Sequence, residues 1–124
     1  MTGGASEDRV SGAAPRLSVV VPTYNRGPLL RDTIDAILRS RLDRVGATEL
    51  IVVDDGSPVP ADLGPGATAP GFTVSLLRRP NGGPAAARNT GYRAARGDIV
   101  LFIDDDITVP PDLVERHLAA HERL

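Results

Sequence analysis

The stretch DIVLFIDDDI (residues 98–107) joins an apolar run directly to three consecutive aspartates. Residues 99–103 are all apolar, which predicts a strand buried in the core. The aspartates that follow repel one another unless positive charge compensates them. On an extended backbone Asp104 and Asp106 point to one side and Asp105 to the other. Two carboxylates on one side suit Mg²⁺ or Mn²⁺, which bind one or two carboxylates together with phosphate oxygens and water. The stretch therefore predicts a strand that ends in a site for a divalent cation and an anionic ligand.

The rest of the chain alternates apolar runs with helical patterns. Further strands are expected at LSVVVP (17–22), ELIVVDDGS (49–57) and FTVSLLR (72–78). Helices are expected at 27–42, 84–96 and 111–124, and an irregular loop at the Pro- and Gly-rich segment 58–71. Because the strands are continuously apolar and alternate with helices, they predict an α/β fold with a mostly parallel sheet covered by helices on both faces.

Length and composition predict one domain with few special features. Residues 1–15 are small, polar and aperiodic and are expected to be a disordered leader, while residues 16–124 form the domain. The net charge of −2 gives no basic footprint for nucleic acid, and no run of 18 apolar residues predicts a membrane span. The chain has no cysteine, which fits a cytoplasmic protein; a peripheral position at the cytoplasmic membrane is left open.

The absence of lysine excludes several classes of protein. All 14 basic residues are arginine. A Walker-type phosphate loop, a Schiff-base enzyme and a receiver-type phosphorylation domain each need a lysine, so the sequence argues against all three. A sugar-phosphate nucleotidyltransferase would share the sheet, but it should open with a Gly-rich basic loop, which PTYNRG (22–27) is not.

Polar clusters follow three of the expected strands: PTYN (22–25), DDGS (54–57) and DDD (104–106). The carboxyl ends of parallel strands meet at one edge, where ligands bind in such sheets. Asp54 is a candidate acceptor for N–H groups of a ligand such as a nucleobase, although Asp-Gly-Ser is also ordinary turn chemistry. RPNGGPAAARNTG (79–91) is either a Gly-rich turn into a helix or an anion site at the helix N-terminus.

Taken in order and spacing, VVVPTYNR, VVDDGS, NGGPAAARNTG and FIDDD resemble the nucleotide-binding half of family 2 glycosyltransferases, which have the GT-A fold. The resemblance covers about residues 17–118. It implies a Rossmann-like half that binds a nucleotide-diphosphate sugar through Mn²⁺ or Mg²⁺. The sugar is then transferred, with inversion, to an acceptor hydroxyl.

The resemblance also implies a role for individual residues. Nucleotide binding is carried over to Pro22, Tyr24, Asn25, Asp54, Asp55, Arg88 and Asp104. Within this set, Asp54 contacts the base with Asp55 beside it, and Arg88 braces the nucleotide. Asp104 lies near the ribose and sugar and shares the metal with Asp106.

The family's acceptor half and its catalytic base lie well downstream of the aspartates, so the sheet is expected to be incomplete and the base to lie outside this chain. Glu115 and Glu122 are expected to face solvent on a helix, and the His117–His121 pair lacks the further ligands of a zinc site. The alternative is a nucleotide-sugar-binding module without turnover. The nucleotide, the sugar and the acceptor stay open.

Overall fold

The structure, a computed structural model, describes residues 15–39, 47–64 and 66–105. Its elements follow in the order β1 (Leu17–Thr23), α1 (Pro28–Leu38), β2 (Thr48–Asp54), β3 (Phe72–Arg78), α2 (Pro84–Ala94) and β4 (Ile99–Phe102). The predicted final helix, Asp106, Glu115, both histidines and residues 1–14 of the expected leader lie outside the described residues. Pro15, which the expected leader includes, is buried.

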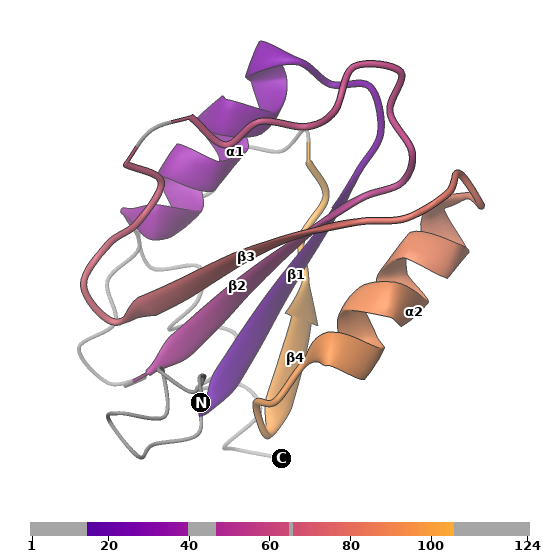
Figure 1. Cartoon of the computed structure of the whole chain (residues 1–124). Helices are drawn as coiled ribbons and strands as arrows, with labels where there is room; N and C mark the ends of the chain where they lie inside the picture. Colours follow the sequence, from indigo (N-terminus) through magenta and orange to yellow (C-terminus); the bar gives the residue numbers. More distant parts are fainter. Residues whose placement is uncertain (1–14, 40–46, 65, 106–124) are drawn as a thin grey trace, which may run out of the picture.

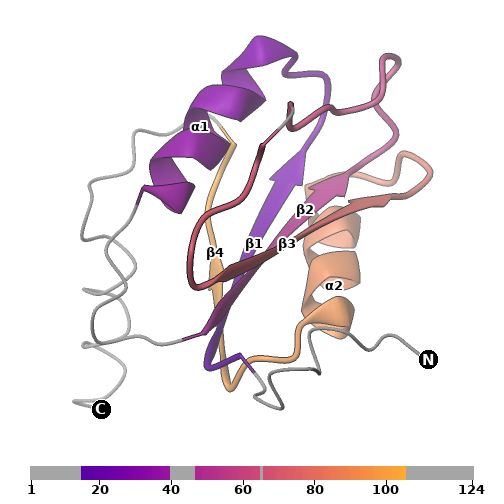
Figure 2. The ribbon, with the colours of Figure 1, turned by 60° about the vertical axis from the view of Figure 1, so that its left-hand side comes forward.

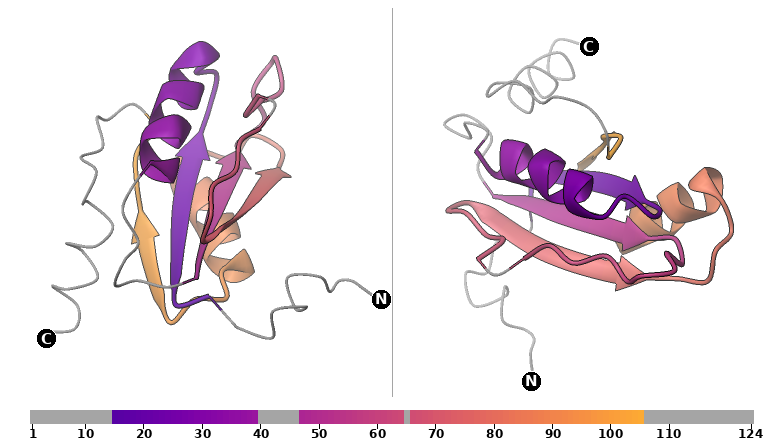
Figure 3. Two further views of the ribbon diagram at one scale, coloured as in Figure 1. Left: turned by 90° about the vertical axis from the view of Figure 1, so that its left-hand side faces the viewer. Right: turned by 90° about the horizontal axis from the view of Figure 1, so that it is seen from above.

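The four strands form one sheet in the order β3-β2-β1-β4, and every neighbouring pair is parallel. The strand arrows point toward the same edge of the sheet (Figure 3). Along this edge the register pairs Thr23 with Asp54 and Asp54 with Arg78. The predicted α/β class and parallel sheet are confirmed, and the polar strand ends meet at the carboxyl edge as expected.

The two helices cover opposite faces of the sheet (Figures 1 and 2). α1 buries Leu30, Ile34 and Ile37 against the odd-numbered positions of β1 and the even-numbered positions of β2. α2 packs Ala87 against the alternate positions of the same strands. Because β1 and β2 are covered on both sides, nearly all of their residues are buried, which explains their continuous apolar runs.

The predicted elements agree with the observed ones except near their ends. α1 ends at Leu38 rather than at residue 42, and β4 covers only residues 99–102 of the expected strand. Residues 58–71 contain no helix or strand among those described, as their proline and glycine content predicted. No helix of the described part is long and apolar enough to cross a membrane.

Gly91 lies in the middle of α2, where glycine weakens a helix, and packing against the sheet explains its presence. A Cβ added at this position would lie 2.3 Å from Val20 Cγ1 and 3.2 Å from Val53 Cγ2. Gly91 is buried, so a Cβ at this position would point into the packed interface between α2 and the sheet and not into solvent. The missing side chain lets α2 approach β1 and β2 closely.

We expect Gly91→Ala to destabilise the protein by about 1–3 kcal/mol through overpacking, although alanine is the better helix former. The free energy of unfolding in urea measures this. In a Val20→Ala background the same substitution should cost less, because the clashing methyl group is absent. Asn89→Ala, at an exposed position of α2, is the matched control and should be neutral or stabilising. A Gly91→Ala protein as stable as the wild type would contradict this packing account.

Candidate functional site

The alternation of side chains continues past the strand ends and divides the polar residues between two sides. On β1, Pro22 and Tyr24 follow Val20 toward the α2 side, whereas Thr23 follows Val21 toward the α1 side. The same parity separates Asp55 from Asp54 after β2, and Asp104 from Asp105 after β4. Neighbouring residues at these strand ends therefore direct their side chains to opposite sides of the sheet.

A cleft of about 420 Å³ lies on the α2 side of the carboxyl edge. Its wall brings together the strand ends, the Gly-rich loop and the first turns of α2. The cleft is lined by Pro22, Thr23, Tyr24, Arg26, Asp55, Asn81, Gly83, Pro84, Ala87, Arg88, Asp104 and Asp105. Pro22, Tyr24, Asp55, Arg88 and Asp104 had been predicted from the sequence as ligand-binding residues, and they share this one cleft.

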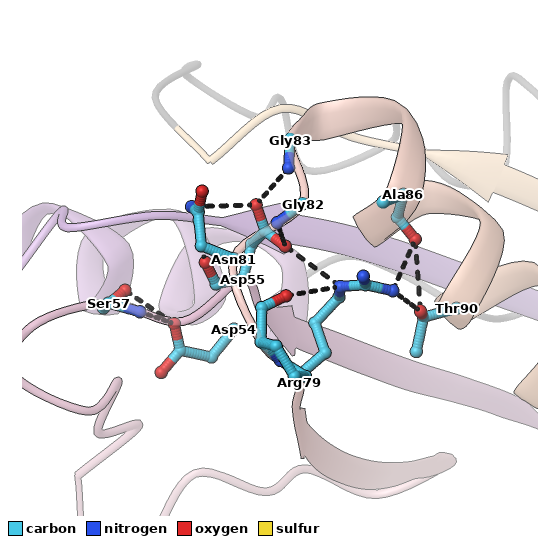
Figure 4. Close-up of polar contacts among 10 residues, drawn as sticks. Asp54, Asp55, Ser57, Arg79, Asn81, Gly82, Gly83, Ala86 and Thr90 are labelled. Carbon is cyan, nitrogen blue, oxygen red and sulfur yellow. Dashed lines mark hydrogen bonds and ion pairs between the residues drawn. The ribbon is translucent and has the colours of Figure 1, made fainter.

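The Asp55 carboxylate holds the Gly-rich loop against the end of β2 (Figure 4). It accepts hydrogen bonds from the backbone N–H groups of Gly82 at 3.0 Å and Gly83 at 2.8 Å. Asn81 Nδ2 and Arg79 Nε also contact it, at 3.3 Å and 3.1 Å. The two N–H groups just before α2 are thus bound by a carboxylate of the chain itself.

Arg79 links this carboxylate to α2. Its Nη1 donates to Thr90 Oγ1 at 2.8 Å and to the Ala86 carbonyl at 3.4 Å, while its Nε faces Asp55 (Figure 4). Sequence reasoning gave Arg79 no role. Because one guanidinium spans the strand end and the helix, it fixes the α2 wall of the cleft relative to β2.

Asp54 does not line the cleft, although the resemblance assigns it to nucleotide binding together with Arg88 and Asp104. Its carboxylate is only 1% exposed and points to the other side of β2. It accepts hydrogen bonds from the backbone N–H and hydroxyl of Ser57, at 3.0 and 2.6 Å, and from the Ala61 N–H at 2.9 Å. Arg78 Nη1 completes the shell at 2.7 Å. These four donors tie the start of the loop after β2 to the sheet.

The surroundings of Asp54 keep it ionised. Burial alone would raise the pKa of this carboxyl, but the hydrogen bonds from Ala61 and Ser57 and the Arg78 guanidinium outweigh burial. The pKa of Asp54 therefore lies below its ordinary value of 3.8.

The middle aspartate of the triple is compensated within the chain. Asp105 is 6% exposed, and Arg26 Nε contacts its two carboxylate oxygens at 3.1 and 3.2 Å. The Thr33 hydroxyl donates to its backbone carbonyl at 2.9 Å. The charge conflict of three adjacent aspartates is thus reduced by an arginine 79 positions away in sequence.

Two charged side chains of the cleft have no partner among residues 15–39, 47–64 and 66–105. They are the Arg88 guanidinium and the Asp104 carboxylate, and Asp104 is exposed. Tyr24, a residue that is 46% exposed, adds an aromatic surface. The cleft therefore offers an aromatic face, one cation and one carboxylate to a ligand.

Asn25 lies in a second cavity, of about 450 Å³, between the start of α1 and the loop after β2. This second cavity is lined by Thr23, Asn25, Arg26, Gly27, Pro28, Leu30, Arg31, Ser57, Val59, Pro60, Ala61 and Asp62. The Asn25 N–H donates to Ser57 Oγ at 2.8 Å. Of the predicted site residues that the structure describes, Asn25 and Asp54 are the two outside the cleft, because both face the α1 side.

The described residues contain no group of three or more His, Cys, Asp or Glu side chains that could hold a metal ion. Asp104 is the one carboxylate of the cleft without a protein partner in that part of the chain. Its oxygens have the chemistry that Mg²⁺ and Mn²⁺ prefer.

The parallel sheet, its two-sided cover and a cleft at the carboxyl edge are features of the GT-A type of α/β fold. The family model described as "Glycosyl transferase family 2" matches residues 18–124. The chain belongs to this family.

Curated relatives agree with the family. The chain is 34% identical over 103 residues to the uncharacterized glycosyltransferase EpsJ of Bacillus subtilis. This match covers 82% of the chain and 29% of EpsJ. It is 40% identical over 107 residues to the succinoglycan biosynthesis protein ExoO of Rhizobium meliloti, covering 82% of this chain and 28% of ExoO.

Solved structures show the same fold. A fragment of S. aureus TarS in complex with UDP-GlcNAc superposes with a TM-score of 0.67 at 26% identity, covering 87% of this chain and 31% of that one. The mannosyltransferase PcManGT of Pyrobaculum calidifontis, in complex with GDP-Man and Mn²⁺, superposes with a TM-score of 0.65 at 32% identity. The match covers 87% of this chain and 32% of PcManGT. The chain spans about a third of the length of these relatives.

The depressed pKa of Asp54 predicts a pH-dependent contribution to stability. The ionised carboxylate stabilises the fold above pH 3.8, the ordinary pKa of an aspartate, and this stabilisation is lost as pH falls through the lower folded-state pKa. Asp54→Asn should lower the free energy of unfolding by about 2 kcal/mol at pH 7, and by less near pH 3. Urea unfolding at both pH values measures the difference. Asp98→Asn, an exposed site, is the control; equal losses for the two variants would contradict the role of Asp54.

Proposed function

We propose that this chain binds the nucleotide-diphosphate-sugar donor of a glycosyl transfer reaction. The observation that carries the proposal is the cleft, in which residues from four separate segments of the sequence meet: Tyr24, Asp55, Arg88 and Asp104. Neighbours in complex with UDP-GlcNAc and with GDP-Man support the class of ligand. Membership of the family supports transfer as the reaction.

The chemistry of the cleft suggests how the donor would lie. Tyr24 offers a ring on which a base can stack, with Pro22 beside it. Arg88 supplies a cation without a partner in the described residues, suited to phosphate oxygens. Asp55 closes the wall beside the base, but its carboxylate already accepts three hydrogen bonds and forms an ion pair with Arg79. In this proposal Asp54 shapes the adjoining loop instead of contacting the base.

Metal binding is part of the proposal. Asp104, together with Asp106 outside the described residues, would hold Mn²⁺ or Mg²⁺, as the Mn²⁺ complex of PcManGT suggests for the family. Such a cation supplies Lewis-acid stabilisation of the departing diphosphate. Asp104 is suited to this position because it lines the cleft at the end of β4 and is exposed.

We further propose transfer with inversion to an acceptor hydroxyl. Asp55 and Asp105 are engaged within the chain, so neither offers an available carboxylate to deprotonate an acceptor. The base is therefore assigned to a residue outside those described. A cytoplasmic location, with which the absence of cysteine is compatible, belongs to the same proposal.

Nucleoside diphosphate binding should depend on a divalent cation and on Asp104. Calorimetric titration of UDP and GDP with Mn²⁺, and again with chelator, should show tighter binding with the metal. Asp104→Asn should remove this gain, since it removes a charged ligand oxygen. Asp98→Asn, an exposed aspartate at the opposite end of β4, is the matched control and should keep it. If neither nucleotide binds the wild-type chain with Mn²⁺, the proposed function is wrong.

Arg88 should contribute to nucleotide binding whether or not the metal is present. Arg88→Gln should weaken UDP or GDP binding by about 10–100-fold, the equivalent of a charge-assisted hydrogen bond. Arg93→Gln, an exposed arginine near the other end of α2, is the control for charge on the same helix. Equal affinities for the Arg88 and Arg93 variants would remove Arg88 from the site.

A further inference from the structure

Thr23 carries a buried hydroxyl group with no hydrogen-bond partner in the described residues. The residue is only 4% exposed, and its backbone carbonyl accepts the Asp55 N–H at 2.9 Å, whereas its side-chain hydroxyl has no partner among the described residues. A buried hydroxyl without a partner costs about 1–3 kcal/mol relative to a paired one. Thr33, which is also 4% exposed, shows the usual arrangement, because its hydroxyl donates to the Asp105 carbonyl at 2.9 Å. The exception at Thr23 therefore needs an explanation.

Thr23 lies between the cleft and the second cavity. It lines both the cleft and the second cavity, and the other residue common to them is Arg26. The parity of β1 directs its side chain to the α1 side, where the second cavity lies. The hydroxyl is thus in the wall between the proposed donor cleft and a neighbouring cavity that the proposed function leaves unused.

The charges of the second cavity are balanced within the chain. Arg26 contacts Asp105 at 3.1 Å, and Arg31 Nη2 contacts Asp62 at 2.8 Å. An anion would have to compete with these carboxylates, and a cation would meet two guanidinium groups. The cavity therefore favours a ligand without net charge.

The remaining wall is partly apolar. Pro28, Leu30, Pro60 and Ala61 provide apolar surface, and Thr23 provides a group that can both donate and accept a hydrogen bond. A volume of about 450 Å³ is within the range of small-molecule sites. Neutral rings with an apolar C–H face and a rim of hydroxyl or amide groups have the matching chemistry.

We propose that the second cavity is a carbohydrate subsite, distinct from the donor cleft, in which the Thr23 hydroxyl hydrogen-bonds a neutral sugar ring. The inference rests on the proposed function, because glycosyl transfer needs an acceptor hydroxyl besides the donor and a sugar ring supplies such hydroxyls. It adds a site and a residue that the donor cleft does not include.

The test combines two measurements on isosteric variants. Thr23→Val removes the hydroxyl and keeps the shape, so it should melt at the wild-type temperature or higher. Thr33→Val loses a made hydrogen bond and should melt about 4–8 °C lower. If the melting temperature of Thr23→Val falls as far as that of Thr33→Val, the Thr23 hydroxyl has a partner in the fold and the proposal is wrong.

Binding is measured by NMR titration with N-acetylglucosamine and with mannose, in the presence of saturating UDP and Mn²⁺. Either sugar should shift the amide signals of residues around the second cavity, such as Leu30 and Ala61. Thr23→Val should weaken this binding about three- to tenfold, while Thr23→Ser should restore it.

Three outcomes would overturn the proposal: no shift of the second-cavity amides with either sugar, equal sugar affinity for wild type and Thr23→Val, or displacement of UDP by the sugar. The first two remove the subsite, and the third places the sugar in the cleft. UDP binding by the wild-type chain without any sugar is measured separately, so failure of the subsite and failure of the proposed function are distinguishable.

Discussion

The two-residue period of a sheet covered on both faces is the constraint on which this structure depends. With α1 on one face and α2 on the other, every side chain of β1 and β2 must belong to one layer or the other. The alternation of side chains persists beyond the strand ends. There the cleft lies on the α2 side of the sheet and the second cavity on the α1 side. Adjacent residues such as Asp54 and Asp55 are therefore separated: Asp55 reaches the cleft, and Asp54 holds the loop on the opposite side. The chemistry of the carboxyl edge follows from this division.

Buried charge imposes the second condition, since an uncompensated carboxylate in the interior is costly. Each buried aspartate of the carboxyl edge has an arginine partner: Arg78 for Asp54, Arg79 for Asp55 and Arg26 for Asp105. These contacts join segments far apart in sequence and fix their relative positions. The lysine-free composition suits this role, because a guanidinium can contact a carboxylate and a second acceptor in one plane. Arg79 does so between the end of β2 and the first turns of α2.

Most of the fold could be predicted from the sequence because continuous apolar runs and helical spacing are local signals. The convergence of the strand ends followed from parallel topology. The division of roles between Asp54 and Asp55 was missed, although its signal was present: Asp55 shares the parity of Ile51 and Val53, which pack against α2. The partner of Asp105 could not be predicted, because nothing local connects it to an arginine 79 positions away. Gly91 counted against a helix by propensity, and only packing explains it.

The charged groups of the cleft that have no partner in the described residues determine which ligand the cleft can bind. The Gly82 and Gly83 N–H groups just before α2 are bound by Asp55, so these two do not compensate the charge of a diphosphate in the cleft. Arg88 alone offers one positive charge from a side chain without a partner in the described residues, and the carboxylate of Asp104 would repel phosphate. A divalent cation reverses the sign at Asp104 and turns that repulsion into attraction. The same internal pairing that stabilises the carboxyl edge thus makes the proposed donor site depend on a metal.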